Sequence, residues 1–301
     1  MKLLLTGAFN YNKEQLNTLQ SLGYEILFIQ DERLPLQVDV SDIDAVVCNS
    51  LFLYNDIKKF KSLKYIQLTS AGVDRVPLDY IKEQRIKLYN AKDVYSIPMA
   101  EWVVLKVLEI YKKSLQFYKS QSEHNWEKRR NLFELTDKNV AIIGFGSVGR
   151  EVAKRLKAFG VNIFGVSRSV INSGIVNEYY NIAKIEEVLS KSDIVVFTIP
   201  HTSETNHLVD ANKIAKMKDN CVLVNVSRGG IIDEDALITA LLNDKFLGVA
   251  LDVFEEEPLS KNNPLWDIER VIVTPHNSFV SDKVEERLFK LTLKNLRSSK
   301  V

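Results

Sequence analysis

The apolar residues of this chain fall into short continuous runs, separated by stretches in which they recur every three or four residues. A continuous apolar run is typical of a strand covered on both faces, whereas the wider spacing is typical of one face of a helix. The runs predict strands at residues 2–5, 24–29, 45–48, 65–68, 87–89, 140–143, 161–166, 193–199, 221–226, 248–253 and 271–274. The spaced stretches predict helices at residues 14–22, 57–63, 78–83, 148–159, 182–189, 213–217, 233–243 and 284–296. Strands that alternate with helices in this way indicate an α/β fold built on parallel sheets.

A further predicted helix begins at Pro98, and its apolar residues, the last of which is Leu115, lie on almost every side. A proline is tolerated in the first turn of a helix, because the N–H group that it lacks would have no helical partner there. A helix that is apolar all round is buried against other parts of a protein. We therefore expect this helix to lie between two domains or against the same helix of a second subunit, which makes it the candidate interface of a homodimer.

A glycine motif in the middle of the chain predicts a nucleotide site. The strand at residues 140–143 leads into Gly144, Gly146 and Gly149, which are spaced as G-x-G-x-x-G and are followed by a helix. In a dinucleotide-binding turn the first glycine permits a tight turn, the second lets the backbone approach a pyrophosphate, and the third lets the helix pack against the strand. The motif alone also occurs in flexible turns, but the strand before it and the helix after it favour dinucleotide binding at the helix N-terminus.

The end of the next strand bears on which dinucleotide is bound. NAD sites usually carry Asp or Glu about 20 residues further on, where it holds the ribose 2′-hydroxyl. Residues 152–177 contain no acidic residue, and Ser167 and Arg168 stand at the strand end. A guanidinium group suits a 2′-phosphate, whereas a carboxylate would repel it. The pattern favours NADP(H) over NAD(H), with a solvated surface arginine as the alternative interpretation.

Length, composition and charge set outer limits on the function. The 301 residues suggest about two domains, and 46% hydrophobic and 26% charged residues are ordinary for a globular protein. A formal net charge of +1 gives no overall field that would favour nucleic acid or an anionic membrane. No histidine and cysteine cluster has zinc spacing, so we expect no metal, and Cys48 and Cys221 lie in apolar runs as small buried residues. The N-terminal stretch turns polar too soon for a signal peptide and no apolar run could span a bilayer, so we expect a cytoplasmic protein.

Polar side chains follow several predicted strands, at the ends where parallel α/β sheets bind their ligands. In the first half these are residues 49–51 and 70–72, which are equally typical of plain turns. In the second half they are Arg228, Glu257 and His276. Beside a nicotinamide, the arginine would bind and polarise a 2-oxo acid, the histidine would give a proton, and the carboxylate would orient the imidazole. Taken singly, the three are also typical of a surface turn, a solvated acidic loop and a structural histidine.

These residues stand in stretches that resemble the D-isomer-specific 2-hydroxyacid dehydrogenases. That family includes glyoxylate/hydroxypyruvate reductases, phosphoglycerate dehydrogenases and D-lactate dehydrogenases. The resemblance covers nearly the whole chain in the family's order, and it is far more specific than the glycine motif alone. The matching stretches are TSAGVD (69–74), MAEWVV (99–104), GFGSVG (144–149), IPHTSET (199–205), NVSRGGIIDEDAL (225–237), ALDVFEEEPL (250–259) and VTPHNS (273–278).

The resemblance implies an α/β fold of two Rossmann-like, doubly wound parallel-sheet domains. A dinucleotide-binding domain at residues 98–277 would be inserted into a flavodoxin-like substrate domain, formed by residues 1–97 and 278–301, with catalysis in the cleft. The family is usually dimeric through the cofactor domain, in agreement with the apolar helix after Pro98.

The resemblance also implies a role for each matching residue. His276 would be the general acid/base, Glu257 its partner, and Arg228 the group that binds the substrate carboxylate and carbonyl. The expected substrate contacts are the backbone N–H groups of Ala71 and Gly72, with Ser50, Tyr95 and Arg228. The expected cofactor contacts are Gly144, Gly146, Ser147, Val148, Gly149, Ser167, Arg168, Ile199, Pro200, Ser227, Asp252, His276 and Ser278. Among these, Asp252 would meet the nicotinamide carboxamide.

We therefore predict an NADP(H)-dependent reductase that converts small 2-oxo acids into D-2-hydroxy acids, with NAD(H) as the alternative cofactor. Ser167 and Arg168 depart from the NAD-using members and resemble the NADPH-using reductases. Two other functions share the pattern, namely a dinucleotide-sensing binding protein of the corepressor kind and a dehydrogenase of another small acid such as phosphite or formate. The complete set of Arg228, Glu257 and His276 favours the enzyme.

Overall fold

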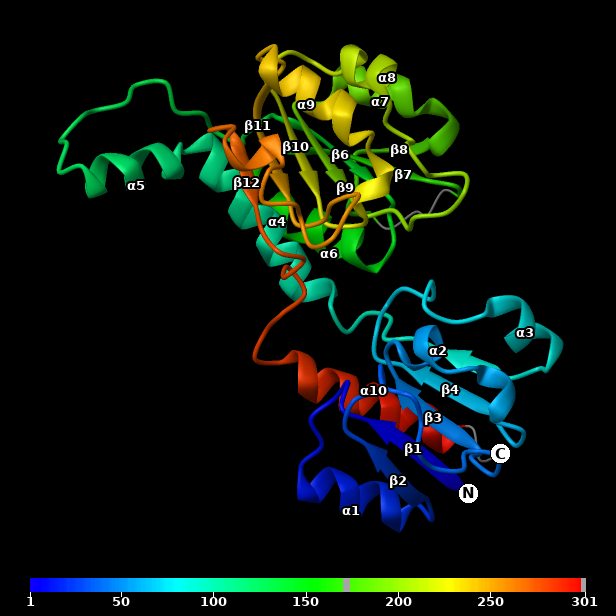
Figure 1. Ribbon diagram of the computed structural model, residues 1–301. Coiled ribbons are helices and arrows are strands. Elements are labelled where there is room, and N and C mark those ends of the chain that lie inside the picture. Colours follow the sequence, from blue (N-terminus) through cyan, green and yellow to red (C-terminus); the bar gives the residue numbers. More distant parts are fainter. Residues whose placement is uncertain (170–173, 299–301) are drawn as a thin grey trace. The chain divides into compact units, whose positions relative to one another are not determined.

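The chain divides into two compact units in a computed structural model that describes residues 1–169 and 174–298 (Figure 1). Unit 1 comprises Met1–Tyr95 and Ser281–Val301, and unit 2 comprises Ser96–Val280. Each unit is built around one parallel sheet with helices packed against it, which confirms the predicted fold class of two parallel-sheet α/β domains. No helix in the described part of the chain is both long and apolar enough to cross a membrane.

Unit 1 contains a five-stranded sheet in the order β2-β1-β3-β4-β5, with every neighbouring pair parallel. Its strands are β1 (Lys2–Thr6), β2 (Glu25–Ile29), β3 (Ala45–Cys48), β4 (Tyr65–Leu68) and β5 (Lys87–Tyr89). Its helices are α1 (Lys13–Ser21), α2 (Leu51–Tyr54), α3 (Leu78–Glu83) and α10 (Val284–Ser298). The strand order reverses between β1 and β3, which makes this the topological switch point of a doubly wound sheet.

Both faces of the unit 1 sheet are covered, as its continuous apolar strands require. Leu4 of β1 packs on one face with Val46 of β3, while Leu3 and Leu5 point to the other face. There they meet Leu296 of α10, so the last helix of the chain completes the core of the unit that contains its first strand. Full burial of each such side chain stabilises the fold by about 1.5–3 kcal/mol.

Unit 2 contains a seven-stranded parallel sheet in the order β12-β11-β10-β9-β6-β7-β8. Its strands are β6 (Asn139–Ile143), β7 (Asn162–Ser167), β8 (Glu178–Asn181), β9 (Ile194–Phe197), β10 (Cys221–Asn225), β11 (Phe246–Leu251) and β12 (Val271–Val273). Its helices are α4 (Ser96–Tyr111), α5 (Ser114–Ser122), α6 (Ser147–Leu156), α7 (Ile185–Lys191), α8 (Ala211–Lys216) and α9 (Glu234–Leu242). The order reverses between β6 and β9, so the switch point of this sheet lies beside the glycine motif.

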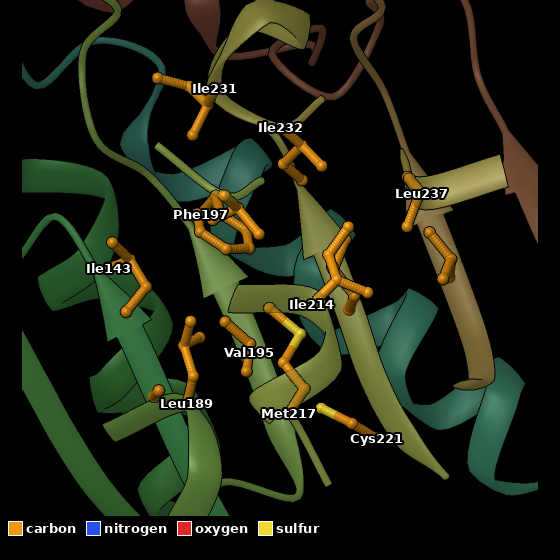
Figure 2. Packing of buried hydrophobic residues seen from close by; sticks show 14 of the residues in the cluster. Ile143, Leu189, Val195, Phe197, Ile214, Met217, Cys221, Ile231, Ile232 and Leu237 are labelled. Carbon is orange, nitrogen blue, oxygen red and sulfur yellow. The ribbon is translucent and has the colours of Figure 1, made fainter. Parts of the chain in front are cut away.

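Helices also cover both faces of the unit 2 sheet. On one face Val195 and Phe197 of β9 pack against Ile214 of α8 and Leu237 of α9 (Figure 2). On the other face the side chains of α4 and α6 join those of β6 in a second buried cluster. The two cysteines are free and buried.

Several elements differ from the sequence prediction, and helix α2 was not predicted. Strand β8 had not been predicted, and residues 57–63 form only a short 3-10 helix at Ile57–Lys59. The helix predicted after Pro98 is in fact two helices, because Lys113 adopts a left-handed conformation with φ 53° between α4 and α5. The expectation that this helix is buried all round is met on one face only: Val103 and Val107 are fully buried, whereas Leu105 is 49% exposed.

Candidate active site

The glycine turn in unit 2 allows close contacts between backbones at the switch point. Gly144 has φ +97°, and a Cβ atom there would lie 2.5 Å from the backbone nitrogen of Ile199, which follows β9. A Cβ atom on Gly149 would lie 2.4 Å from the carbonyl oxygen of Gly144. By contrast, nothing lies within 4 Å of a Cβ atom built on Gly146. The turn is therefore packed at its first and third glycines and open at its second, as a cradle for a phosphate group requires.

Helix α6 begins directly after this open glycine. Ser147 and Val148 are its first two residues, and Gly146 at the N-cap position has no side chain that could accept their N–H groups. The first N–H groups of a helix lack helical partners and attract anions. Ile199 is buried beside the turn and Pro200 is exposed just after it. These residues fit a pyrophosphate, but their cofactor contacts stay predictions.

The predicted ribose contacts lie at the end of β7. Ser167 is the last residue of the strand, and its hydroxyl donates to the carbonyl oxygen of Ser169 at 2.5 Å. Arg168 is exposed, and its carbonyl oxygen accepts from the Asn181 side chain at 3.0 Å. The backbone of Arg168 is thus tied to the edge strand β8, while its side chain faces solvent.

Glu257 and His276 form a hydrogen-bonded pair at the carboxyl edge of the same sheet. His276 Nδ1 lies 2.8 Å from Glu257 Oε2, and the backbone N–H of Phe254 donates to Glu257 Oε1 at 3.1 Å. Burial raises the pKa of Glu257, but the bonds from His276 and Phe254 and the charges of His276 and Arg228 outweigh burial and lower it. A charged Glu257 therefore holds the imidazole through Nδ1 and fixes the orientation of the ring.

A buried carboxylate supports the turn that carries His276. Asp252 is fully buried and accepts from the Thr274 hydroxyl at 2.5 Å, the Asn277 N–H at 2.8 Å and the Ser278 N–H at 2.9 Å. The backbone N–H of His276, which has φ 50°, donates to the Asp252 carbonyl oxygen at 2.8 Å. The structure thus places Asp252 inside this turn, and its contact with a nicotinamide stays a prediction. The Ser278 hydroxyl is buried and has no hydrogen-bond partner in the described part of the chain.

Arg228 follows β10, next to the strand that precedes Glu257. Asn225 fixes the turn, because its side chain donates to the Arg228 carbonyl oxygen at 2.9 Å and accepts from the N–H of Ser227 at 3.0 Å and its hydroxyl at 2.8 Å. A Cβ atom on Gly229 would lie 1.8 Å from the carbonyl carbon of Phe254. The backbones of the Arg228 and Glu257 loops are therefore in contact, and only glycine allows this approach.

The predicted substrate residues of unit 1 lie at the carboxyl ends of its strands. Ser50 precedes α2, and Ala71 and Gly72 lie in the turn after β4, where the Asn90 side chain donates to the Ala71 carbonyl oxygen at 2.6 Å. The Tyr95 hydroxyl donates to the carbonyl oxygen of Thr69, and burial raises the pKa of Tyr95 to about 12. Tyr95 therefore keeps its proton at neutral pH. The roles of these four residues towards a substrate stay predictions.

Sequence patterns gave no sign of Glu32, a buried acid in the loop after β2. Its carboxylate accepts a hydrogen bond from the Ser50 hydroxyl at 2.8 Å, so the hydroxyl proton of Ser50 already has an acceptor within the protein. An acid in a polar loop after a strand gives no pattern that distinguishes it from a solvated residue. Within residues 1–169 and 174–298, no group of His, Cys, Asp and Glu side chains is arranged to hold a metal ion.

Comparison with known proteins gives matches over most of the chain. Residues 104–278 match the family model described as D-isomer specific 2-hydroxyacid dehydrogenase, NAD binding domain. The chain is 32% identical to a D-3-phosphoglycerate dehydrogenase of Methanocaldococcus jannaschii over 95% of its own length, although it spans only 55% of that protein. It is 31% identical to a glyoxylate reductase of Thermofilum pendens, with coverage of 86% of this chain and 78% of the relative. A crystal structure of a glyoxylate reductase from Paecilomyes thermophila has a TM-score of 0.87 and 26% identity, and the match covers 99% of this chain and 95% of that one.

Proposed function

Because the chain belongs to the D-isomer-specific 2-hydroxyacid dehydrogenase family, we propose that it reduces a small 2-oxo acid to a D-2-hydroxy acid with NADPH. The observation that carries this proposal is the contact of 2.8 Å between His276 and Glu257 in the unit that also contains Arg228 and the open glycine turn. A proton donor and an anion-binding arginine are the groups that carbonyl reduction of a 2-oxo acid needs.

The nicotinamide supplies a hydride to the carbonyl carbon when the cofactor is bound. His276 gives the proton from Nε2 to the carbonyl oxygen, while Glu257 accepts from Nδ1 and stabilises the positive charge of the imidazolium. Because the pKa of Glu257 is lowered from its ordinary value, the carboxylate is charged at neutral pH. After each turnover, His276 takes up a proton from solvent at Nε2.

Arg228 binds the substrate carboxylate and polarises the carbonyl group. Its guanidinium is partly buried, and one of its N–H groups donates to the Ser227 carbonyl oxygen at 2.8 Å, which fixes the direction of the side chain. A guanidinium fork presents parallel donors that match a carboxylate. In unit 1, the N–H groups of Ala71 and Gly72 are further proposed donors to the substrate carboxylate.

NADPH is the proposed cofactor because a cation, and no acid, stands at the end of β7. The exposed Arg168 side chain would pair with the 2′-phosphate, and the short Ser167 leaves room for it. Ser147 and Val148 would donate to the pyrophosphate across the open face of Gly146. Ile199 and Pro200 would line the nucleotide groove. Ser227, Asp252 and Ser278 complete the proposed set of contacts.

We further propose a homodimer formed through α4. The support is the exposed Leu105 on a helix that carries few polar residues. Light scattering should give twice the mass of the chain, and Leu105→Glu should reduce that mass to that of a monomer. A monomeric wild-type protein would refute this part of the proposal.

The test of the function is the loss of reduced nicotinamide absorbance with purified protein. NADPH and NADH are compared side by side against glyoxylate, hydroxypyruvate, pyruvate and branched 2-oxo acids, and the chirality of the product is determined. Turnover with NADPH preferred and a D-product is expected. Dinucleotide binding without turnover of any 2-oxo acid would refute the reductase and favour a sensor, and turnover of formate or phosphite alone would favour a dehydrogenase of those acids.

A further inference from the structure

Glu32 is a carboxylate that the fold keeps out of water. Its residue is 6% exposed, although it lies in a loop. Oε2 accepts from the Thr6 hydroxyl at 2.7 Å and the Asn49 N–H at 3.0 Å, and Oε1 accepts from the N–H and the hydroxyl of Ser50 at 2.5 Å and 2.8 Å. Each oxygen accepts a hydrogen bond from a backbone N–H group. The side chain therefore acts as an acceptor through both oxygens, which is the role of a charged carboxylate.

The position of this carboxylate in the sheet is specific. Glu32 follows β2, Thr6 is the last residue of β1, and Asn49 and Ser50 directly follow β3. These strands are neighbours in the order β2-β1-β3, so the carboxylate connects the two sides of the switch point between β1 and β3. The backbone carbonyl of Glu32 also accepts from Asn55 at 3.1 Å, which fixes the loop itself. Switch points are where open α/β sheets bind their ligands.

The charge of the adjacent Arg33 interacts with the Glu32 carboxylate, but the two side chains form no ion pair. No lysine, arginine or histidine in residues 1–169 and 174–298 forms an ion pair with Glu32, and the adjacent Arg33 is paired with Asp31 instead, at 3.0 Å through two parallel bonds. A charge in a site shielded from water acts over a longer distance than one on the surface. The switch-point edge of unit 1 therefore contains a buried carboxylate that is held by the hydroxyl and N–H groups of Thr6, Asn49 and Ser50.

We propose that Glu32 restricts the enzyme to 2-oxo acids whose side chain carries no negative charge. The proposal rests on the proposed reductase function and adds to it the class of substrate. Glu32 acts in two ways: it fixes the turn at Asn49 and Ser50, and its charge repels a second anionic group on an acid that is already held by its carboxylate. It is a positioning residue and a determinant of specificity, and it takes no part in proton or hydride transfer.

The test compares 2-oxo acids that share a linear five-carbon chain and differ in the group at its far end. These are 2-oxoglutarate, 2-oxovalerate and 5-guanidino-2-oxopentanoate, which end in an anion, a methyl group and a cation. In the wild-type protein, kcat/KM is expected to be lowest for the anion, and the cation is expected to be used at least as well as the neutral acid. An anionic acid that is used as well as the neutral one would overturn the proposal without any variant.

Three variants separate charge from shape. Glu32→Gln removes the charge and keeps the size, and it should raise the ratio of kcat/KM for 2-oxoglutarate to that for 2-oxovalerate by on the order of tenfold. Glu32→Asp keeps the charge but shortens the reach, and it should lower kcat/KM for both acids while leaving their ratio within about twofold. Glu83→Gln makes the same change of charge at an exposed glutamate of α3 in unit 1, where solvent screens it, and should leave the ratio unchanged.

The outcomes distinguish this proposal from the function on which it rests. If the protein turns over 2-oxo acids but Glu32→Gln leaves the ratio of kcat/KM for 2-oxoglutarate to that for 2-oxovalerate unchanged, the substrate restriction is overturned and the reductase function stands. The same conclusion follows if Glu32→Asp changes this ratio as much as Glu32→Gln does. If the wild-type protein reduces no 2-oxo acid, the function fails, and calorimetric binding of the three acids to the protein with NADPH replaces kcat/KM. Equal affinity for the three acids, or no binding of any of them, then overturns the restriction as well.

Discussion

The two units present different chemistry at the carboxyl ends of sheets that are built alike. Both sheets are parallel and doubly wound, and each reverses its strand order once. At the switch point of unit 2 the backbones meet directly at Gly144 and Ile199, and the next glycine leaves an open space beside the start of α6. At the switch point of unit 1 the gap is bridged by Glu32, a carboxylate supplied by the protein itself.

The two edges therefore differ in the hydrogen-bond donors that they leave to a ligand. In unit 2 the first N–H groups of α6 remain available and Arg168 adds a positive charge nearby, so the edge suits phosphate groups. In unit 1 the N–H groups of Asn49 and Ser50 already bind the Glu32 carboxylate. An internal anion thus occupies donors that an external one would need, and the four predictions below test the residues at the edge of unit 2.

The largest effect is expected from the proton donor of unit 2. His276→Ala should lower kcat by about 10²-fold or more, because proton transfer by a positioned side chain contributes that much. Steady-state kinetics with the best 2-oxo acid would measure it. His207→Ala is a matched control, since His207 also pairs with a glutamate, Glu255, at 2.9 Å but lies outside the proposed site. Equal losses in both variants would remove His276 from the mechanism.

The contact between the Arg228 and Glu257 loops should give the next largest effect. Gly229→Ala places a Cβ atom 1.8 Å from the Phe254 carbonyl carbon, so one loop must move. We expect a loss of about 1–3 kcal/mol in the free energy of unfolding, together with a lower kcat. Gly230→Ala is the control, because its Cβ would meet side chains and no backbone, namely the end of His201 at 3.0 Å and Asn206 Oδ1 at 3.5 Å. Denaturant unfolding that does not distinguish the two variants would contradict the contact.

Periodicity predicted most of the fold, because buried parallel strands have continuous apolar runs. It missed β8, an edge strand with the polar sequence Glu-Tyr-Tyr-Asn, since only one of its residues is buried. It also joined α4 to α5, because nothing in the apolar pattern marks the left-handed conformation of Lys113. Apolar spacing reports burial, and these two features depend on pairing and on a single backbone angle.

The candidate site was partly predictable for a related reason. Residues that follow strands of one parallel sheet gather at one edge, so the sequence could place Arg228, Glu257 and His276 together. Their roles in catalysis stay predictions. Glu32 was missed because its contacts come from the end of β1 and from the loop after β3. Asp252 was expected at the cofactor, although its hydrogen bonds lie within the protein. Such contacts form only in the folded chain, and no regular spacing of residues in the sequence indicates them.

A change of cofactor preference would test the edge of unit 2, where we propose that Arg168 binds the 2′-phosphate. The double variant with Ser167→Asp and Arg168→Ala should shift the ratio of kcat/KM for NADPH to that for NADH by on the order of tenfold towards NADH. The cause is the loss of a charge-assisted bond to the 2′-phosphate and the gain of an acceptor for the 2′-hydroxyl. Arg168→Ala alone should weaken NADPH use without improving NADH use. An unchanged ratio in both variants would refute the assignment of Arg168.

The smallest expected effect concerns the pH dependence of stability through Glu257. Its pKa is lowered in the folded protein from an ordinary value of 4.5, so the folded state binds the proton less tightly than the unfolded state. The pair with His276 therefore stabilises the fold above that ordinary pKa, and this stabilisation is lost as the pH falls through the lower folded value. Because the glutamate side chain is 36% exposed, the contribution should stay below about 1 kcal/mol. Thermal unfolding of wild type and Glu257→Gln should differ more at neutral pH than at about pH 3, and a difference that grows on acidification would show that the sign is wrong.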